Sequence, residues 1–189
     1  GTSLGFVIGL LRSSGNAFVR GLLGLYVELF RGTPVLIQLF WIFFCLPLIL
    51  GVEFSNFVSA TIALTLYMGA ITSETFRASL RSVGREQMDA CVALGLPRAA
   101  QIVNVILPQA VLRAVPTLLS NAVSLFKESA LVSAVGMADL MFIGQNISNN
   151  TARPVEVLTV VAAIYFVIAF PLTRAVTVVE QKLLRKFSA

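Results

Sequence analysis

The sequence predicts an all-α integral membrane protein that forms a single transmembrane domain over residues 1–189. Hydrophobic residues make up 57% of its 189 residues and charged residues 12%. Typical soluble domains have about 45–50% and about 25% of these residues. The mean hydropathy is +0.89. A soluble fold of this size could not bury so much apolar surface, so we expect the chain to lie in a bilayer.

About five membrane-spanning helices are expected, because one span needs about 20 largely apolar residues. The apolar runs cover approximately residues 1–14, 34–51, 56–80, 110–133 and 155–179. The first run is too short to cross a bilayer alone, and we interpret it as the end of a truncated first helix. Residues 15–31 mix apolar and basic side chains, which suits either a short helix along the membrane surface or an extension of the first helix.

The distribution of positive charge predicts the orientation of these helices. Every Lys and Arg except Lys127 and Arg153 falls in one of three segments, 12–31, 77–113 and 174–186. Positive residues concentrate in cytoplasmic segments of membrane proteins. We therefore expect the N-terminus outside and the C-terminus in the cytoplasm. The net charge of +5 is then explained by topology, and no nucleic acid partner is expected.

Several kinds of catalytic chemistry lack the residues they need. The chain has no histidine, and its two cysteines, Cys45 and Cys91, are far apart. We therefore expect no zinc or haem site and no histidine-based triad. No lysine follows a GxxxxG pattern, so no phosphate-binding loop is expected. The chain is not expected to be an enzyme, and any ATP used with it would bind to another subunit.

A polar connection over residues 84–108 separates the third and fourth predicted spans. It is long enough for two short helices. Gly95 can end the first of them in the left-handed conformation, and Pro97 suits the first turn of the second. A structured loop of this length is a candidate docking surface.

Three ordered motifs resemble the permease subunits of binding-protein-dependent type I ABC importers. The loop GREQMDACVALGLPRAAQIVNVILPQA is similar to their EAA loop, with Asp89, Ala90 and Cys91 at the E-A-A positions. YVELFRGTPVLIQLF, residues 26–40, resembles the entry to the second span in the polar amino acid group, which carries histidine, glutamine, arginine or opines. LPQAVLRAVPTLLSNAVSLFKESAL, residues 107–131, is similar to a third motif of that group.

The resemblance implies an importer in the bacterial inner membrane that moves a polar amino acid or related small solute into the cytoplasm. Two permease subunits, identical or homologous, would form the pathway. Two ABC ATPase subunits would bind ATP and Mg²⁺, and an extracytoplasmic solute-binding protein would deliver the cargo. The EAA loop would couple ATPase closure to switching between inward- and outward-facing states. Its implied coupling residues are Gln87, Met88, Asp89, Ala90, Cys91, Ala93, Gly95, Leu96, Pro97 and Arg98.

A polar stripe on the fourth predicted span is the candidate substrate pathway. Its members follow one another at spacings of four, three and four residues, so they share one helix face. Such residues are costly against lipid and should face protein or water. Two interpretations stay open, because the stripe could line the pathway or could bond neighbouring helices. The stripe residues are Thr117, Asn121, Ser124 and Glu128, flanked by Lys127.

Glu74 in the third predicted span also has two interpretations. It is either the i, i+3 ion-pair partner of Arg77 or a gate or cargo contact. On the same span a face of small residues, which includes Gly69 and Thr72, favours close helix packing. Two other functions would fit a membrane protein of this kind. One is the same importer machinery for a different small solute, and the other is a passive channel or scaffold subunit.

Overall fold

The computed structural model describes residues 1–14 and 16–187, and the regular structure within these two ranges is helical without strands. Gly15, Ser188 and Ala189, which the predicted domain includes, lie outside the described residues, as do the side chains of Arg85, Arg185 and Lys186. The elements are α1 Thr2–Ser14, α2 Ala17–Gly32, α3 Val35–Phe40, a π-helical segment Trp41–Cys45, α4 Leu46–Leu50, α5 Asn56–Ser82, α6 Arg85–Ala93, α7 Arg98–Ala100, a second π-helical segment Gln101–Ile106, α8 Leu107–Glu128, a 3₁₀ segment Ser129–Val135, α9 Leu140–Thr151 and α10 Pro154–Phe187.

Three of the described helices are long and apolar enough to cross a membrane. They are Asn56–Ser82, the continuous helix Arg98–Val135 and Pro154–Leu183. A fourth candidate is the pair formed by Ala17–Gly32 and Val35–Leu50, which is bent by 111°. The remaining apolar helix, Thr2–Arg12, is shorter. The all-α membrane fold class predicted from the sequence is confirmed.

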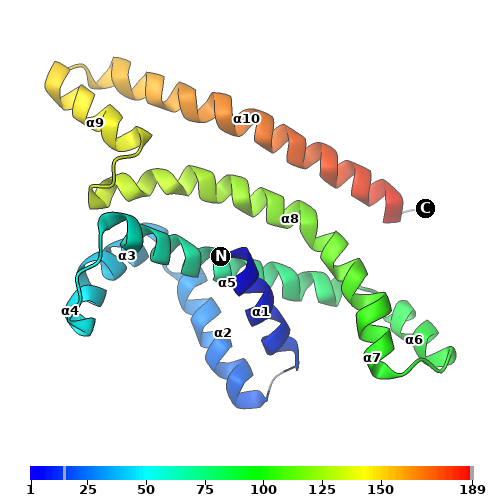
Figure 1. Ribbon diagram of the computed structural model, residues 1–189. Helices are drawn as coiled ribbons and strands as arrows, with labels where there is room; N and C mark the ends of the chain where they lie inside the picture. The colour runs from blue at the N-terminus through cyan, green and yellow to red at the C-terminus, as the bar shows by residue number, and fades with distance from the viewer. Residues whose placement is uncertain (15, 188–189) are drawn as a thin grey trace.

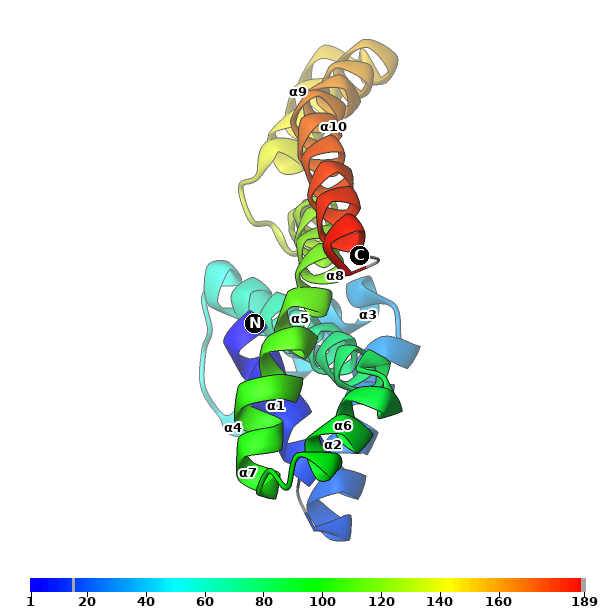
Figure 2. The same cartoon turned by 90° about the vertical axis from the view of Figure 1, so that its right-hand side faces the viewer.

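The helices form successive layers in the order α10, α8, α5 and then α1 with α2 (Figure 1). The view at right angles shows the same order, with the α9–α10 hairpin at the far side from α1 and α2 (Figure 2). Helix α5 lies at the centre and packs against α1, α2 and α8. The short helix α6 and the C-terminal end of α10 lie toward one end of the molecule, and α9 lies at the other (Figure 1).

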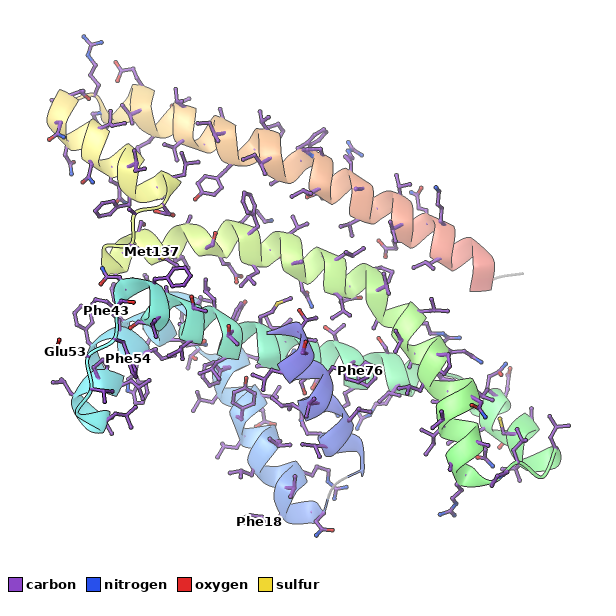
Figure 3. The ribbon with its side chains drawn as sticks, viewed as in Figure 1. Phe18, Phe43, Glu53, Phe54, Phe76 and Met137 are labelled. Carbon is purple, nitrogen blue, oxygen red and sulfur yellow. The ribbon has the colours of Figure 1, made fainter. Side chains whose placement is uncertain are left out.

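Close approach of α1 to α5 depends on glycine. A Cβ added at Gly5 would lie 2.6 Å from the carbonyl oxygen of Gly69 and 2.5 Å from Cβ of Thr72, closer than real side chains come. Thr72 is buried in this contact, and so is Phe76 farther along α5 (Figure 3). Close helix packing is thereby confirmed as the role of Gly69 and Thr72.

Residues 16–31 do not extend the first helix, so that one of the two alternatives for this segment is wrong. Asn16 has an extended backbone, and α2 starts after it as a separate helix that contacts both α1 and α5. The Tyr26 hydroxyl donates a 2.6 Å hydrogen bond to the carbonyl oxygen of Leu66 in α5. One residue further, Val27 is only 1% exposed. Burial of this face against α5 is the physical reason that the chain turns back.

Both π-helical segments precede a proline that would otherwise break its helix. Proline lacks a backbone N–H and crowds the preceding turn. Instead, the helical turn before Pro108 widens. The Leu107 N–H bonds to the carbonyl oxygen of Ile102, five residues back. The second short helix expected in the loop is therefore not separate. It is the first turn of the continuous helix that begins at Arg98 and runs on through α8.

Candidate functional site

The loop between α5 and the continuous helix is built on one tight turn. Gly95 adopts a left-handed conformation with φ of +67°. Its N–H bonds to the Val92 oxygen at 2.9 Å, and the Leu96 N–H bonds to the Cys91 oxygen at 3.1 Å. These bonds satisfy carbonyl groups that the end of α6 leaves open. The sequence-based expectation for Gly95 is confirmed.

Helix α6 has one face against its own chain and one face open. Cys91 is 3% exposed, so this candidate coupling residue packs inside the chain. The open face carries Met88 and Val92, which are 46% and 66% exposed, and Leu94, just after the helix, is 77% exposed. The other candidate coupling residues on α6 and its turn are exposed, except for Leu96, which is half-buried. They are Gln87, Asp89, Ala90, Ala93, Gly95, Pro97 and Arg98.

The sequence analysis missed Val92 and Leu94 as exposed apolar residues of this loop. Val92 lies one helical turn after Met88, so helical spacing could have found it. Two side chains tie the loop to the continuous helix. The Gln101 amide donates to the Leu96 oxygen at 2.7 Å, and the Gln109 amide donates to Oε1 of Gln87 at 3.4 Å. The loop therefore presents an apolar surface on a fixed base.

Part of the polar stripe on α8 faces α5. The Asn121 amide donates a 3.0 Å hydrogen bond to Oγ1 of Thr75, and the Tyr67 hydroxyl donates a 3.1 Å bond to Oε1 of Glu128. Thr75 and Tyr67 were missed from the sequence, although their spacing of eight residues, about two turns, places them on one face of α5. Asn121 and Glu128 thus make hydrogen bonds between helices of the kind that the helix-bonding interpretation predicts.

The other part of the stripe faces α10. Here α8 and α10 border a groove of about 280 Å³ that is rich in hydroxyl groups. The groove carries one basic side chain from α8 and one acidic side chain from α10. The polar lining residues are Thr117, Ser120, Ser124 and Lys127 of α8 and Thr173, Thr177 and Glu180 of α10. The structure thus divides one predicted stripe between two neighbours.

Glu74 binds three arginines from three helices. Its Oε2 lies 3.2 Å from Nη1 of Arg12 in α1 and 4.0 Å from Nη1 of Arg31 in α2. Arg77 of α5 donates through Nε at 3.0 Å and also contacts the other oxygen. The ion pair of Glu74 with Arg77 that their i, i+3 spacing predicts is present. Arg12 and Arg31 were missed because no local spacing links them to residue 74.

Comparison with known proteins decides the family. The chain matches the model for the inner membrane component of binding-protein-dependent transport systems over residues 1–185. The chain belongs to this permease family. The permease is 35% identical over 184 residues to the putative glutamine transport system permease protein GlnP of Rickettsia felis. This match covers 97% of the permease and 84% of that relative. It is 34% identical over 183 residues to the arginine transport system permease protein ArtQ of Bacillus subtilis, with coverage of 97% and 84%.

Solved structures agree with this assignment. The permease is similar to a chain in the crystal structure of an amino acid ABC transporter with histidines, with a TM-score of 0.91, 31% identity, and coverage of 96% of the permease and 84% of that chain. An inward-facing structure of the methionine ABC transporter MetNI matches with a TM-score of 0.68 and 23% identity, covering 94% and 88%. That second likeness shows the fold alone. The family recognised in the sequence is confirmed.

Proposed function

We propose that the permease is the transmembrane subunit of an ATP-driven importer that moves a polar amino acid or a related small solute into the cytoplasm. The groove between α8 and α10 carries this proposal, because Lys127 and Glu180 place opposite charges among its hydroxyl groups. A zwitterionic amino acid offers a carboxylate and an ammonium group that complement them. Relatives named for glutamine and arginine transport support the same class of cargo.

The groove and the α5 contacts suggest different tasks for the stripe residues. Thr117, Ser124 and Lys127 line the groove and are the proposed cargo contacts. Asn121 and Glu128 bond to α5, so they hold the wall of the groove in position. In the same way Glu74 joins α1, α2 and α5 through its arginines.

Coupling to ATP is proposed to run through α6. Its exposed apolar residues, Met88, Val92 and Leu94, would rest on an ABC ATPase subunit that binds ATP and Mg²⁺. Two such ATPases and a second permease, identical or homologous, would complete the assembly. The distribution of basic residues supports a cytoplasmic α6 and C-terminus with an outer N-terminus. An extracytoplasmic solute-binding protein would then dock at the end that carries α9.

The coupling proposal is tested by ATPase activity of the assembled transporter in proteoliposomes, with loaded binding protein and a panel of amino acids. Val92→Glu places a charge on the open face of α6 and should abolish stimulation while the complex still assembles. Gln181→Glu adds the same charge at an exposed position near the C-terminal end of α10 and should leave stimulation intact. Stimulation that survives Val92→Glu, or a complex that lacks an ATPase, would refute coupling and favour a channel or scaffold.

The cargo proposal is tested by uptake in the same vesicles. Thr177→Phe places a ring in the groove from α10 and should reduce uptake of the stimulating amino acid more than tenfold. Val178→Phe is the matched control, because Val178 is the next residue, is 49% exposed and does not line the groove. Equal uptake by the two variants would show that cargo does not pass along this groove.

A further inference from the structure

The groove between α8 and α10 carries its two charged side chains at opposite ends. The C-terminus of α10 and the short helix α7 lie toward the same end of the molecule, so α8 and α10 run in opposite directions (Figure 1). Lys127 is the last groove residue of α8, and Glu180 is the last groove residue of α10. At 1.5 Å per residue, the groove follows α8 for about 16 Å over residues 116–127 and α10 for about 10 Å over residues 173–180. The backbones that carry the two charges are therefore about 10–16 Å apart along the groove.

The α10 wall of the groove is a row of hydrogen-bond acceptors. The Thr173 hydroxyl donates to the carbonyl oxygen of Ala169 at 2.9 Å, and the Thr177 hydroxyl donates to the carbonyl oxygen of Thr173 at 3.1 Å. A hydroxyl group has a single donor hydrogen and two acceptor lone pairs, and a carboxylate accepts only. Both threonines therefore have only acceptor positions left for the groove, and Glu180 adds a carboxylate one turn further along the same helix face.

The distance between the charges and the row of acceptors together restrict the cargo. The carboxylate and the ammonium group of an amino acid backbone are bonded to one carbon atom, so they lie side by side. When the carboxylate meets Lys127, only the side chain of the cargo extends toward Glu180. A guanidinium group has five N–H donors and an ammonium group has three, and neither has an acceptor. A glutamine side chain would instead bring a carbonyl oxygen to a wall that already consists of acceptors.

We propose that the groove selects amino acids with a cationic side chain, with the carboxylate on Lys127 and the side-chain cation on Thr177 and Glu180. This inference rests on the proposed function and narrows its cargo. Glu180 is then the residue that distinguishes a cationic side chain from a neutral polar one. Hydrogen bonds between ionised groups are about twice as strong as those between neutral groups, so the preference depends on the charge of Glu180 more than on the threonines.

The test compares arginine with citrulline, which has the same length and shape but a neutral urea group in place of the guanidinium. Equilibrium dialysis measures binding of each radiolabelled amino acid to the assembled transporter, without the solute-binding protein, so that only the transporter selects. We expect arginine to bind about tenfold more tightly, the effect of one hydrogen bond to a charged group. Glu180→Gln should remove this preference by weakening arginine alone. Lys127→Gln should weaken both ligands equally. The control Glu28→Gln, at an exposed position of α2, should keep the preference.

Several results would overturn the proposal. They are equal binding of arginine and citrulline, binding of neither, a preference for arginine that survives Glu180→Gln, and a preference that Glu28→Gln also removes. The proposed function fails in a different way, through equal uptake by Thr177→Phe and Val178→Phe. If Thr177→Phe blocks uptake of a neutral amino acid while arginine binds no more tightly than citrulline, the groove stays the pathway and the selectivity for cations is refuted.

Discussion

Alanine at Gly5 is expected to destabilise the permease, because α1 and α5 are closest there. The added methyl group would lie 2.5 Å from Cβ of Thr72 and 2.6 Å from the Gly69 carbonyl oxygen. Neither atom belongs to the flexible end of a side chain, so the two helices must separate. Overpacking of this kind costs about 1–3 kcal/mol. Alanine regains about 1 kcal/mol of helix propensity, so the net loss is about 0–2 kcal/mol.

Two other glycines give a graded comparison. At Gly9 the added Cβ would meet Cδ1 of Phe76 at 3.1 Å and the Ser73 oxygen at 3.2 Å, which requires a smaller shift. At Gly21 of α2 no described atom lies within 4 Å, so alanine adds helix propensity alone. The expected order of stability is therefore Gly21→Ala, then Gly9→Ala, then Gly5→Ala.

Thermal unfolding of the purified transporter in detergent measures this order. For a chain of this size 1 kcal/mol corresponds to about 2–4 °C, so Gly5→Ala should lower Tm by up to about 8 °C. Gly21→Ala should leave Tm unchanged or raise it by about 2 °C. A Gly5→Ala protein that melts with or above Gly21→Ala would refute the close packing of α1 on α5.

Three further substitutions test other contacts by the same melting assay. Glu74→Gln leaves three guanidinium groups without a countercharge and should cost about 2 kcal/mol, whereas Glu28→Gln, at an exposed position, should not. Gly95→Ala forces a side chain into the left-handed region at φ of +67° and should cost about 1 kcal/mol, while Gly32→Ala, at the end of α2 with no described atom within 4 Å of the added Cβ, should not. Tyr67→Phe removes the donor to Glu128, whose Oε2 has no partner among the described residues, and should cost about 1–3 kcal/mol. That cost should shrink in a Glu128→Gln background, and equal costs in both backgrounds would show that the two side chains do not interact.

The sequence predicted the features that depend on composition and on local geometry. Apolar content and run length predicted a helical membrane protein, and the glycine after α6 predicted the left-handed turn. These succeed because a bilayer imposes a fixed length on each span and because few residues adopt positive φ. The motifs around residues 26–40 and 107–131 predicted the family.

Contacts between distant residues could not be predicted in this way. Arg12 and Glu74 are 62 residues apart, and Asn121 and Thr75 are 46 apart. A polar stripe on a helix indicates that polar neighbours exist, but it does not say which helix supplies them. For this reason one stripe was expected where the structure has two surfaces. Folding of α2 onto α5 was missed for the same reason, because its apolar and basic residues also suit a membrane surface.

The continuous helix from Arg98 to Val135, 38 residues long, has a mechanical consequence. Arg98 follows the loop turn and Lys127 lies at the groove, so one hydrogen-bonded backbone joins them over about 44 Å at 1.5 Å per residue. The helix bends between α7 and α8 (Figure 1), so about 44 Å is its length along the axis and the direct distance is shorter. In the proposed coupling, a movement of the loop at Arg98 would be carried to Lys127 along this one backbone, without a flexible connection between the two.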